Sequence, residues 1–225
     1  MTITIYGAPL SPFVRKVRVV LAEKQLEYKI DPISPFAPPP DFAEISPLKR
    51  IPVMRDDSEG PEALLPDSSA ICAYLERKHP SPALYPTAPF AYGKALWFEE
   101  YADSDFVATT GLGIFRPIVV NKLMRRDADL NLAQDTWDNK VQTFLAYYEK
   151  ELDSRTYFVG DSFSIADISV ASPFVNVAHA GFAPDGSRYP NLVRFLKATL
   201  ARPSFAACIA EERKALSKLG IEYAL

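Results

Sequence analysis

The chain has 225 residues, of which 48% are hydrophobic and 24% are charged, with a net charge of −3. This length suffices for one large domain or two small ones, and the composition is ordinary for a soluble globular protein. Charges of both signs are dispersed along the chain, so the sequence shows no basic patch of the kind that binds nucleic acid. The chain has no run of 18 apolar residues and no signal-like start. We therefore expect a cytoplasmic protein with no membrane and no nucleic-acid partner.

The two cysteines and the two histidines form no metal-binding pattern. Cys72 and Cys208 each lie in an apolar helical pattern, and the chain contains no C-x-x-C. His79 and His179 lie at no ligand spacing from each other or from the cysteines. We expect packing or surface roles for all four, no structural disulfide in a reducing compartment, and no metal.

Residues 1–79 alternate between strand and helix patterns. Residues 2–6 and 27–33 predict strands, and residues 12–24 between them carry apolar side chains at helical spacing. This βαβ unit implies two parallel strands joined by a right-handed crossover. A proline-rich segment follows over residues 32–47, and residues 41–45 within it predict one short helical turn.

The rest of this region predicts a hairpin and a helix. Residues 51–54 and 63–65 are short apolar runs separated by polar residues, which is typical of two antiparallel strands. Residues 68–78 have the apolar face of a helix. The N-terminal region thus has the predicted order βαβ followed by ββα.

Four prolines within residues 80–89 exclude a continuous helix, so we place a linker there. Beyond it, over residues 90–225, an apolar period of 3.6 residues predicts helices and no strand. We expect helices at residues 90–126, 134–152, 165–177, 192–200 and 204–219. Gly111, Gly113 and Pro117 are predicted to bend or interrupt the first of them. The chain is predicted to combine an α/β domain with an all-α domain.

A local signature marks the start of the third of these helices. Ser164 stands as an N-cap with Asp167 three residues on, and Phe163 and Ile168 are placed as a hydrophobic staple. We assign this capping box a structural role and no catalytic one.

Ser11 lies directly before Pro12 and the first predicted helix. Serine is a preferred N-cap and proline is favoured at the first helical position, so Ser11 is expected at the helix start. A helix start offers unpaired N–H groups and a partial positive charge, which suit an anion such as a thiolate. From the residues alone, Ser11 is either a cap only or also a hydroxyl that holds an anionic atom.

Two further stretches place polar groups at the starts of elements. Pro52 opens a strand, and a cis Ile51–Pro52 bond would leave the Ile51 backbone free to pair with a peptide-like ligand. The alternative is a trans proline at an edge strand. Asp67 and Ser68 start a helix, where they could bind an ammonium and a carboxylate group or act as a plain capping pair.

In this order, the motifs resemble those of a cytosolic glutathione transferase. Residues 11–17 (SPFVRKV) resemble the serine-type active-site stretch, most like the tau- or zeta-related and bacterial branches, and residues 50–53 (RIPV) resemble the stretch with the family's cis-proline. Asp67-Ser68 stands where members usually carry Glu-Ser, and residues 164–167 resemble their capping box. The resemblance covers essentially the whole chain. It implies a thioredoxin-like N-terminal domain and an all-helical C-terminal domain.

The resemblance also implies glutathione as co-substrate and a role for each motif. Ser11 would donate a hydrogen bond to the glutathione sulfur and favour its thiolate, since a helix start with added donors can lower the pKa of a thiol by about a unit or more. Ile51 would pair its backbone with the cysteinyl unit. Asp67 and Ser68 would hold the γ-glutamyl ammonium and carboxylate groups.

The chain departs from the family pattern in two places. Asp67 replaces the usual glutamate and is one methylene shorter, which would loosen the ammonium contact. No Lys, Arg or His lies between Ile30 and Leu48, where many members bind the glycyl carboxylate. Either Arg50 with Lys49 meets that carboxylate, or solvent does.

The partner of the sulfur and the electrophile site have alternatives of their own. Tyr6, at the end of the first strand, is a second candidate for the sulfur contact, although Ser11 fits the turn better. The electrophile pocket is predicted between the two domains, with an apolar lining. Its expected lining residues, which also fit a plain core, are Pro9, Leu10, Phe106, Thr110, Phe115 and Arg116.

The leading hypothesis is a detoxification enzyme that activates glutathione for attack on small apolar electrophiles, as a homodimer through its third and fourth helices. One alternative is a glutathione-dependent isomerase, peroxidase or reductase on the same fold. A reductase of this family would usually carry a cysteine where Ser11 stands. The other alternative is a non-catalytic binding or assembly module, which would usually have lost the residue that activates the sulfur.

Overall fold

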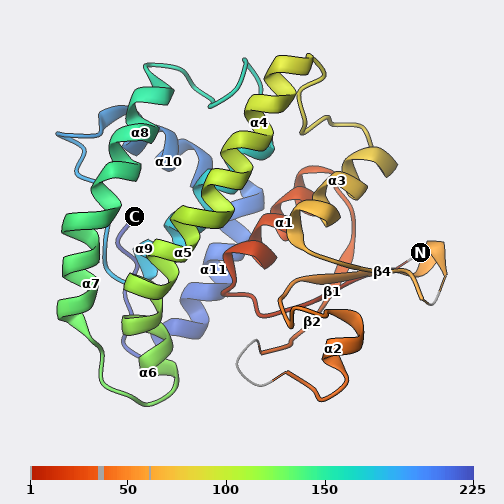
Figure 1. Ribbon diagram of the computed structural model, residues 1–225, viewed down its shortest axis with the longest axis horizontal. Coiled ribbons are helices and arrows are strands. Elements are labelled where there is room, and N and C mark those ends of the chain that lie inside the picture. Colours follow the sequence, from red (N-terminus) through yellow and green to blue (C-terminus); the bar gives the residue numbers. More distant parts are fainter. Residues whose placement is uncertain (1, 35–37, 61) are drawn as a thin grey trace. The chain divides into compact units, whose positions relative to one another are not determined.

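The computed structural model describes residues 2–34, 38–60 and 62–225. Its chain divides into two compact units, Met1–Leu84 and Tyr85–Leu225 (Figure 1). The division falls inside the proline-rich segment 80–89. Every strand of the described residues belongs to the first unit, and the described elements of the second unit are all helical. The α/β and all-α architecture predicted from the sequence is confirmed.

The N-terminal unit is a four-stranded sheet with helices α1 and α3 packed against each other. In chain order its elements are β1 (Ile3–Tyr6), α1 (Pro12–Glu23), β2 (Tyr28–Asp31), α2 (Phe42–Ile45), β3 (Val53–Asp56), the 3-10 turn η1 (Asp57–Glu59), β4 (Leu64–Pro66) and α3 (Ser68–Lys78). The strand order is β2-β1-β3-β4. β1 is parallel to β2 and antiparallel to β3, and β3 is antiparallel to β4. This is the expected thioredoxin-like order, βαβ followed by ββα.

The first strand of the hairpin lies two residues later in the chain than predicted. β3 begins at Val53 rather than at Ile51, because Pro52 has no N–H to donate to a ladder. It runs on to Asp56, because the register pairs Asp56 with Ile3 of β1. Arg55 and Asp56, which were predicted to lie in the polar connection, therefore belong to the strand.

The helical unit contains α-helices interrupted by π-helical segments. In chain order its elements are α4 (Pro89–Tyr101), η2 (Ala102–Phe106), α5 (Val107–Thr110), η3 (Gly111–Val120), α6 (Asn121–Leu123), α7 (Leu130–Thr136), η4 (Trp137–Val141), α8 (Gln142–Leu152), α9 (Ile165–His179), α10 (Pro190–Leu200) and α11 (Pro203–Ser217). The helix predicted over residues 90–126 is thus a succession of α and π segments, with Pro117 inside the π segment η3. Proline lacks the N–H of an α-helical hydrogen bond, so a change of helix type at this position has a local cause.

The core of the helical unit is an aromatic cluster around α9. Every residue of α9 is buried. The rings of Phe106 and Phe174 lie 4.8 Å apart, and those of Phe98 and Phe158 lie 4.8 Å apart. No helix of the described residues is long and apolar enough to cross a membrane. Among the same residues, no group of three or more His, Cys, Asp or Glu side chains is placed to hold a metal ion.

The predicted capping box at the start of α9 is confirmed. The Ser164 N–H and hydroxyl donate to Asp167 Oδ2 at 2.9 and 3.1 Å, and the Phe158 N–H donates to Asp167 Oδ1 at 2.9 Å. Asp167 is fully buried. Burial raises the pKa of Asp167 to about 6, and these hydrogen bonds offset the rise only in part.

Candidate functional site

The three motifs of the N-terminal unit meet at one edge of its sheet. Tyr6 pairs with Val53, and Val53 pairs with Pro66, so the end of β1, the start of β3 and the end of β4 form one row. Neighbouring strands lie about 4.8 Å apart, so this row spans about 10 Å. The turn after β1, the Ile51–Pro52 bond before β3 and Asp67 after β4 therefore lie at the same edge.

Gly7 brings the segment before β3 against the start of α1. A Cβ atom on Gly7 would lie 2.6 Å from Val14 Cγ2 and 3.4 Å from Ile51 Cβ. A side chain at Gly7 would push Val14 and Ile51 apart. The small residue after β1 thus sets the spacing between the Ser11 turn and Ile51.

Ser11 is the N-cap of α1, as predicted. Its backbone is extended, with φ −73° and ψ 129°, and the Val14 N–H donates to Ser11 Oγ at 3.4 Å. The side chain is half-buried. The Ser11 hydroxyl hydrogen has no acceptor among the residues that the structure describes. Since a hydroxyl can accept and donate at once, Ser11 caps the helix and still has a proton to donate.

The Ile51–Pro52 peptide bond is cis. Neither the N–H nor the C=O of Ile51 forms a hydrogen bond with a described residue, although Ile51 is only 8% exposed. This backbone therefore offers one donor and one acceptor at the sheet edge. Pairing with an extended peptide needs these two groups.

Lys49 and Arg50 follow a backbone turn fixed by a buried serine. Ser46 Oγ donates to the Arg50 carbonyl at 2.8 Å and accepts from the Arg50 N–H at 3.0 Å. The side chains of Lys49 and Arg50 are exposed, and neither forms an ion pair within the described ranges. Both charges are therefore available to an anionic group near Ile51.

Asp67 caps α3 in an uncommon backbone conformation. Its φ is 78° and its ψ is 131°, a region that costs a residue with a Cβ about 1–3 kcal/mol. Asp67 Oδ1 accepts from the N–H groups of Ser69 and Ala70 at 2.9 and 3.1 Å. Oδ2 accepts no hydrogen bond from the described chain, so one carboxylate oxygen stays open to a cation. Ser68 beside it is 4% exposed.

Lys16 is a residue of this region that the sequence patterns did not single out. It is fully buried, and its Nζ donates to Ser69 Oγ at 2.9 Å, which ties α1 to the start of α3. A buried ammonium needs such hydrogen bonds, because its desolvation is costly. The apolar spacing of the first helix gave no sign that Lys16 is buried, and only the contact with α3 reveals it.

The residues predicted to line an electrophile pocket fall in both units. Pro9 and Leu10 are half-buried in the turn after β1. In the helical unit, Phe106 and Thr110 are core residues: Phe106 is fully buried, and the Thr110 hydroxyl donates to the Phe106 carbonyl at 2.7 Å. The other two positions reach the surface: Phe115 is half-buried, and Arg116 is exposed.

The protein combines a thioredoxin-like unit, with polar groups free of described partners at one end of its sheet, with a helical unit. This arrangement is that of a two-domain transferase of the glutathione S-transferase type. Residues 5–83 match the family model for the glutathione S-transferase N-terminal domain, and residues 116–203 match the model for the C-terminal domain. The chain belongs to the glutathione S-transferase family.

Individual relatives support this membership over most of the chain. The chain is 29% identical over 211 residues to a glutathione S-transferase from Triticum aestivum, which covers 93% of both proteins. It is similar to the crystal structure of a glutathione S-transferase from Methylobacterium radiotolerans in complex with glutathione sulfonate. That likeness has a TM-score of 0.75 and 28% identity, and it covers 93% of this chain and 95% of the other.

Other relatives have different names. The chain is 29% identical over 187 residues to a probable maleylacetoacetate isomerase from Drosophila melanogaster, covering 80% of this chain and 70% of the relative. It is 22% identical over 223 residues to a stringent starvation protein A homolog from Coxiella burnetii, covering 96% and 95%. The relatives of this chain thus include proteins that are not named as transferases.

Proposed function

We propose that this protein is a glutathione transferase in which the Ser11 hydroxyl donates a hydrogen bond to the glutathione sulfur and favours its thiolate. The observation that carries the proposal is that Ser11 caps α1 as an acceptor and keeps an unused proton. A free thiol has a pKa of about 8.5, which a helix N-terminus and a nearby donor lower. The thiol proton leaves to solvent, and the thiolate forms a bond to an electrophilic carbon of a small apolar substrate as a leaving group departs, which is chloride for a chlorinated nitroarene.

The remaining contacts follow the sheet edge. The free backbone groups of Ile51, next to Pro52, would pair with the cysteinyl unit of the tripeptide. Asp67 Oδ2 would take the γ-glutamyl ammonium, and Ser68 the γ-glutamyl carboxylate. The unpaired charges of Lys49 and Arg50 would meet the glycyl carboxylate.

The electrophile site is proposed from the exposure of its predicted residues. Pro9 and Leu10, with Phe115 and Arg116, stay the predicted electrophile contacts, while the burial of Phe106 and Thr110 favours a supporting role for both.

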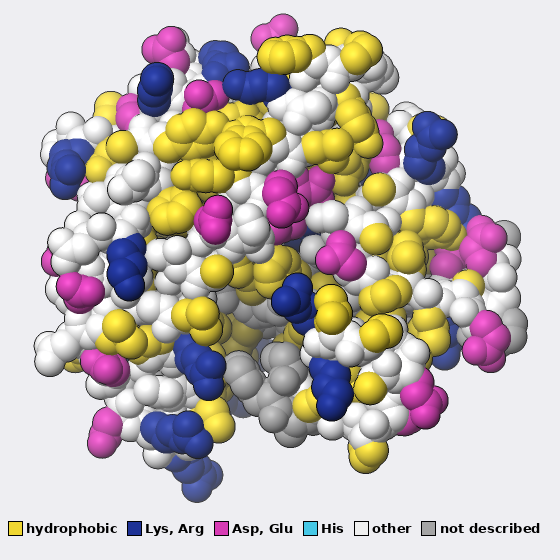
Figure 2. All heavy atoms as spheres, viewed as in Figure 1, with side chains coloured by type: hydrophobic (Ala, Val, Ile, Leu, Met, Phe, Trp, Pro, Cys, Tyr) yellow, Lys and Arg dark blue, Asp and Glu magenta, His cyan; other side chains and the backbone are white. Residues whose placement is uncertain are grey.

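Hydrophobic side chains gather over α4 (Figure 2), where Phe90 is 84% exposed and Trp97 is 49% exposed. This uncovered apolar face supports a homodimer that uses α4 together with α3, and the mass in solution by light scattering tests it.

The test is glutathione conjugation to a chlorinated nitroarene by the wild type and three variants. Ser11→Ala removes the donor and is expected to lower the rate by about ten- to a thousand-fold. Ser11→Asp keeps a good N-cap but presents an acceptor to the sulfur, so we expect it to be at least as inactive. Tyr6→Phe removes the alternative donor and should retain the activity.

Three outcomes would each reject part of the proposal. A wild type that neither binds immobilised glutathione nor conjugates it would leave the alternative of a non-catalytic binding or assembly module. A Ser11→Asp variant with full activity would mean that Ser11 acts only as a cap. Glutathione-dependent isomerisation without conjugation would instead favour the isomerase alternative, and loss of that activity in Ser11→Ala would keep the role of Ser11.

A further inference from the structure

A shallow groove of about 710 Å³ lies along the outer face of α10 and is open to solvent. Its lining residues are Gly186, Pro190, Val193, Arg194, Lys197 and Ala198. Five of them recur at intervals of three or four residues along the helix, so they share one face. The opposite face of α10 is buried against α8, α9 and α11. None of the lining residues belongs to the proposed glutathione or electrophile contacts.

The groove combines apolar surface with two positive charges. Pro190, Val193 and Ala198 supply the apolar surface, and Arg194 and Lys197 are the charged residues of the described lining. The sequence of α10 contains no acidic residue. Since the whole chain has a net charge of −3, this helix face differs in sign from the net charge of the protein. Such a surface is complementary to a ligand that carries both carboxylates and an apolar group.

Neither positive charge is neutralised by an ion pair within the described ranges. Arg194 Nη1 donates to Asn191 Oδ1 at 3.0 Å, and Arg194 Nη2 donates to the Arg155 carbonyl at 2.8 Å. Both acceptors are neutral, and a guanidinium has five N–H groups, so further donors remain. The Lys197 ammonium is exposed and donates to no described atom. The charges of both side chains are therefore available to an anionic partner.

The carboxylates of the adjoining segments are bound by other groups. Glu149 of α8 accepts from the N–H and the side-chain amide of Asn191, at 3.1 and 2.7 Å. Asp185 accepts from the N–H and the hydroxyl of Ser187, both at 2.8 Å. These bonds from Ser187, together with the charge of Arg188, lower the pKa of Asp185. In the described chain, neither carboxylate forms an ion pair with a positive charge of the groove.

We propose that this groove docks an acidic segment of a partner protein in an extended conformation. Residues 190–198 of the helix span about 12 Å. Three alternate side chains of an extended segment lie on one face and span about 14 Å, which matches that length. An apolar side chain rests on Pro190 and Val193, and the next two side chains on the same face are carboxylates that pair with Arg194 and Lys197. A free inorganic anion would use the two charges but not the apolar surface.

The test is a titration of the full chain with short peptides, followed by NMR amide shifts. The probe is an acetylated and amidated heptapeptide in which one leucine and two glutamates alternate with serines. It should shift the amide signals of residues 191–198, with a Kd in the millimolar range. The same peptide with glutamines in place of the glutamates should bind about tenfold more weakly, because two exposed ion pairs are lost. Added salt should reduce this difference.

Variants that remove the two charges test the groove directly. Lys197→Gln removes a charge with no partner in the described chain, and it should reduce the preference for the glutamate peptide to about threefold. Adding Arg194→Gln should abolish the preference. The matched control combines Lys122→Gln with Arg125→Gln, which removes an exposed lysine and an exposed arginine three residues apart near α6. This control should preserve the tenfold preference.

The titration needs no glutathione, so its outcome is separate from that of the transferase proposal. Absence of shifts in residues 191–198, equal binding of the glutamate and glutamine peptides, or an unchanged preference in the variant lacking both charges would each overturn the docking proposal. Inorganic phosphate that gives the same shifts at the same concentration would overturn it in favour of a free anion. Vesicles of phosphatidylserine that bind through these residues more tightly than the peptide would overturn it in favour of a lipid surface.

Discussion

Each unit of the protein buries an aspartate, and the two carboxylates respond to burial in opposite ways. In the N-terminal unit, Asp56 is 3% exposed and accepts from Lys78 Nζ and Tyr74 Oη, both at 2.8 Å, and from Ser58. Burial alone would raise the pKa of Asp56. The hydrogen bonds from Lys78, Ser58 and Tyr74 outweigh that effect and hold the pKa well below its usual value.

In the helical unit, Asp167 accepts hydrogen bonds only from neutral groups, so burial dominates and its pKa rises to about 6. Peptide N–H and hydroxyl dipoles stabilise a carboxylate less than an ammonium does at the same distance. The N-terminal unit thus gives its buried aspartate a charged partner, whereas the helical unit gives Asp167 only neutral partners and builds its core from aromatic rings.

The aromatic core should therefore respond most strongly to truncation. Phe106→Ala removes a fully buried ring that contacts Phe144, Tyr148 and Phe174, and we expect the free energy of unfolding to fall by about 3–5 kcal/mol. Chemical denaturation measures it. Phe115→Ala, at a half-buried position, is the control and should cost about half as much or less. Unchanged stability with a raised KM for the electrophile would instead make Phe106 part of a binding surface.

Asp167 gives the helical unit a distinctive pH dependence. The pKa of its carboxyl group is raised from 3.8 to about 6 in the folded state, so the folded protein binds the proton of Asp167 more tightly than the unfolded chain does. Ionisation of Asp167 should therefore lower the free energy of unfolding as pH rises from about 4 to 6, by on the order of 3 kcal/mol. Asp167→Asn lacks this proton equilibrium.

The difference in unfolding free energy between the wild type and Asp167→Asn, measured by denaturation across this pH range, isolates the effect. The difference should shift steadily in favour of the variant as pH rises. A difference that does not change with pH would mean that the hydrogen bonds to Asp167 offset its burial completely.

Local signals predicted the N-terminal elements that carry the candidate site. The Ser11 cap and the helix over residues 68–78 depend on residues adjacent in sequence, and both are confirmed. The end of β3 was missed, because it depends on pairing between Asp56 and Ile3, which are far apart in the chain. The burial of Lys16 was missed for the same reason, since its partner Ser69 belongs to another helix.

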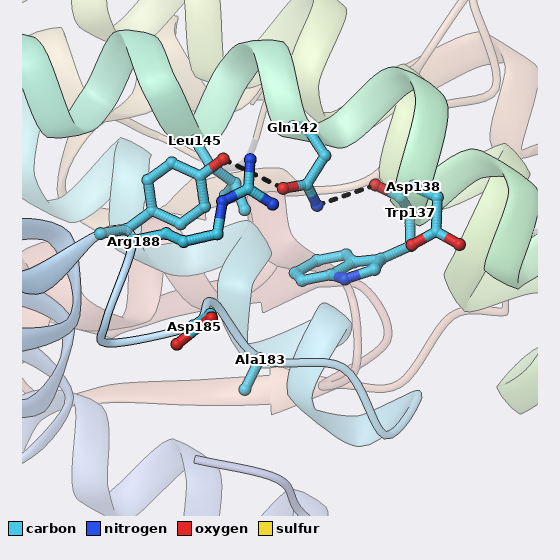
Figure 3. Close-up of a pocket in the computed structure, with 8 residues that line it drawn as sticks. Trp137, Asp138, Gln142, Leu145, Ala183, Asp185 and Arg188 are labelled. Carbon is cyan, nitrogen blue, oxygen red and sulfur yellow. Dashed lines mark hydrogen bonds between the residues drawn. The ribbon is translucent and has the colours of Figure 1, made fainter.

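In the helical unit, the apolar period predicted the helices but not their internal geometry. A Cβ on Gly113 would lie 2.5 Å from the side chain of Thr136, so η3 and the end of α7 approach closely at that glycine. A contact between two segments that are apart in the chain leaves no periodic pattern in the sequence. A cavity of about 350 Å³ beside Trp137 (Figure 3) was likewise not predicted, because its other wall, with Arg188 and Tyr189, comes from the α9–α10 loop, which no motif marks.

The smallest predicted effect concerns the ion pair of the N-terminal unit. Lys78→Met removes the ammonium beside Asp56, and we expect the free energy of unfolding at neutral pH to fall by about 1–2 kcal/mol, because a buried carboxylate loses its charged partner. The folded-state pKa of Asp56 lies below its unfolded value, so its contribution is full above about pH 4 and is lost as pH falls further. The variant should show less of this loss of stability in acid, because only the hydrogen bonds from Ser58 and Tyr74 still lower the pKa of Asp56.

The Arg55–Asp57 pair supplies the control for Lys78→Met. Its two charged atoms also lie close, at 2.9 Å, but its side chains are 38% and 41% exposed. Arg55→Met should therefore change the free energy of unfolding by less than about 0.5 kcal/mol. Equal effects of the two substitutions in urea denaturation would mean that burial does not strengthen the Asp56 pair. Asp56 and Asp167 would then differ for a reason other than the ammonium group of Lys78.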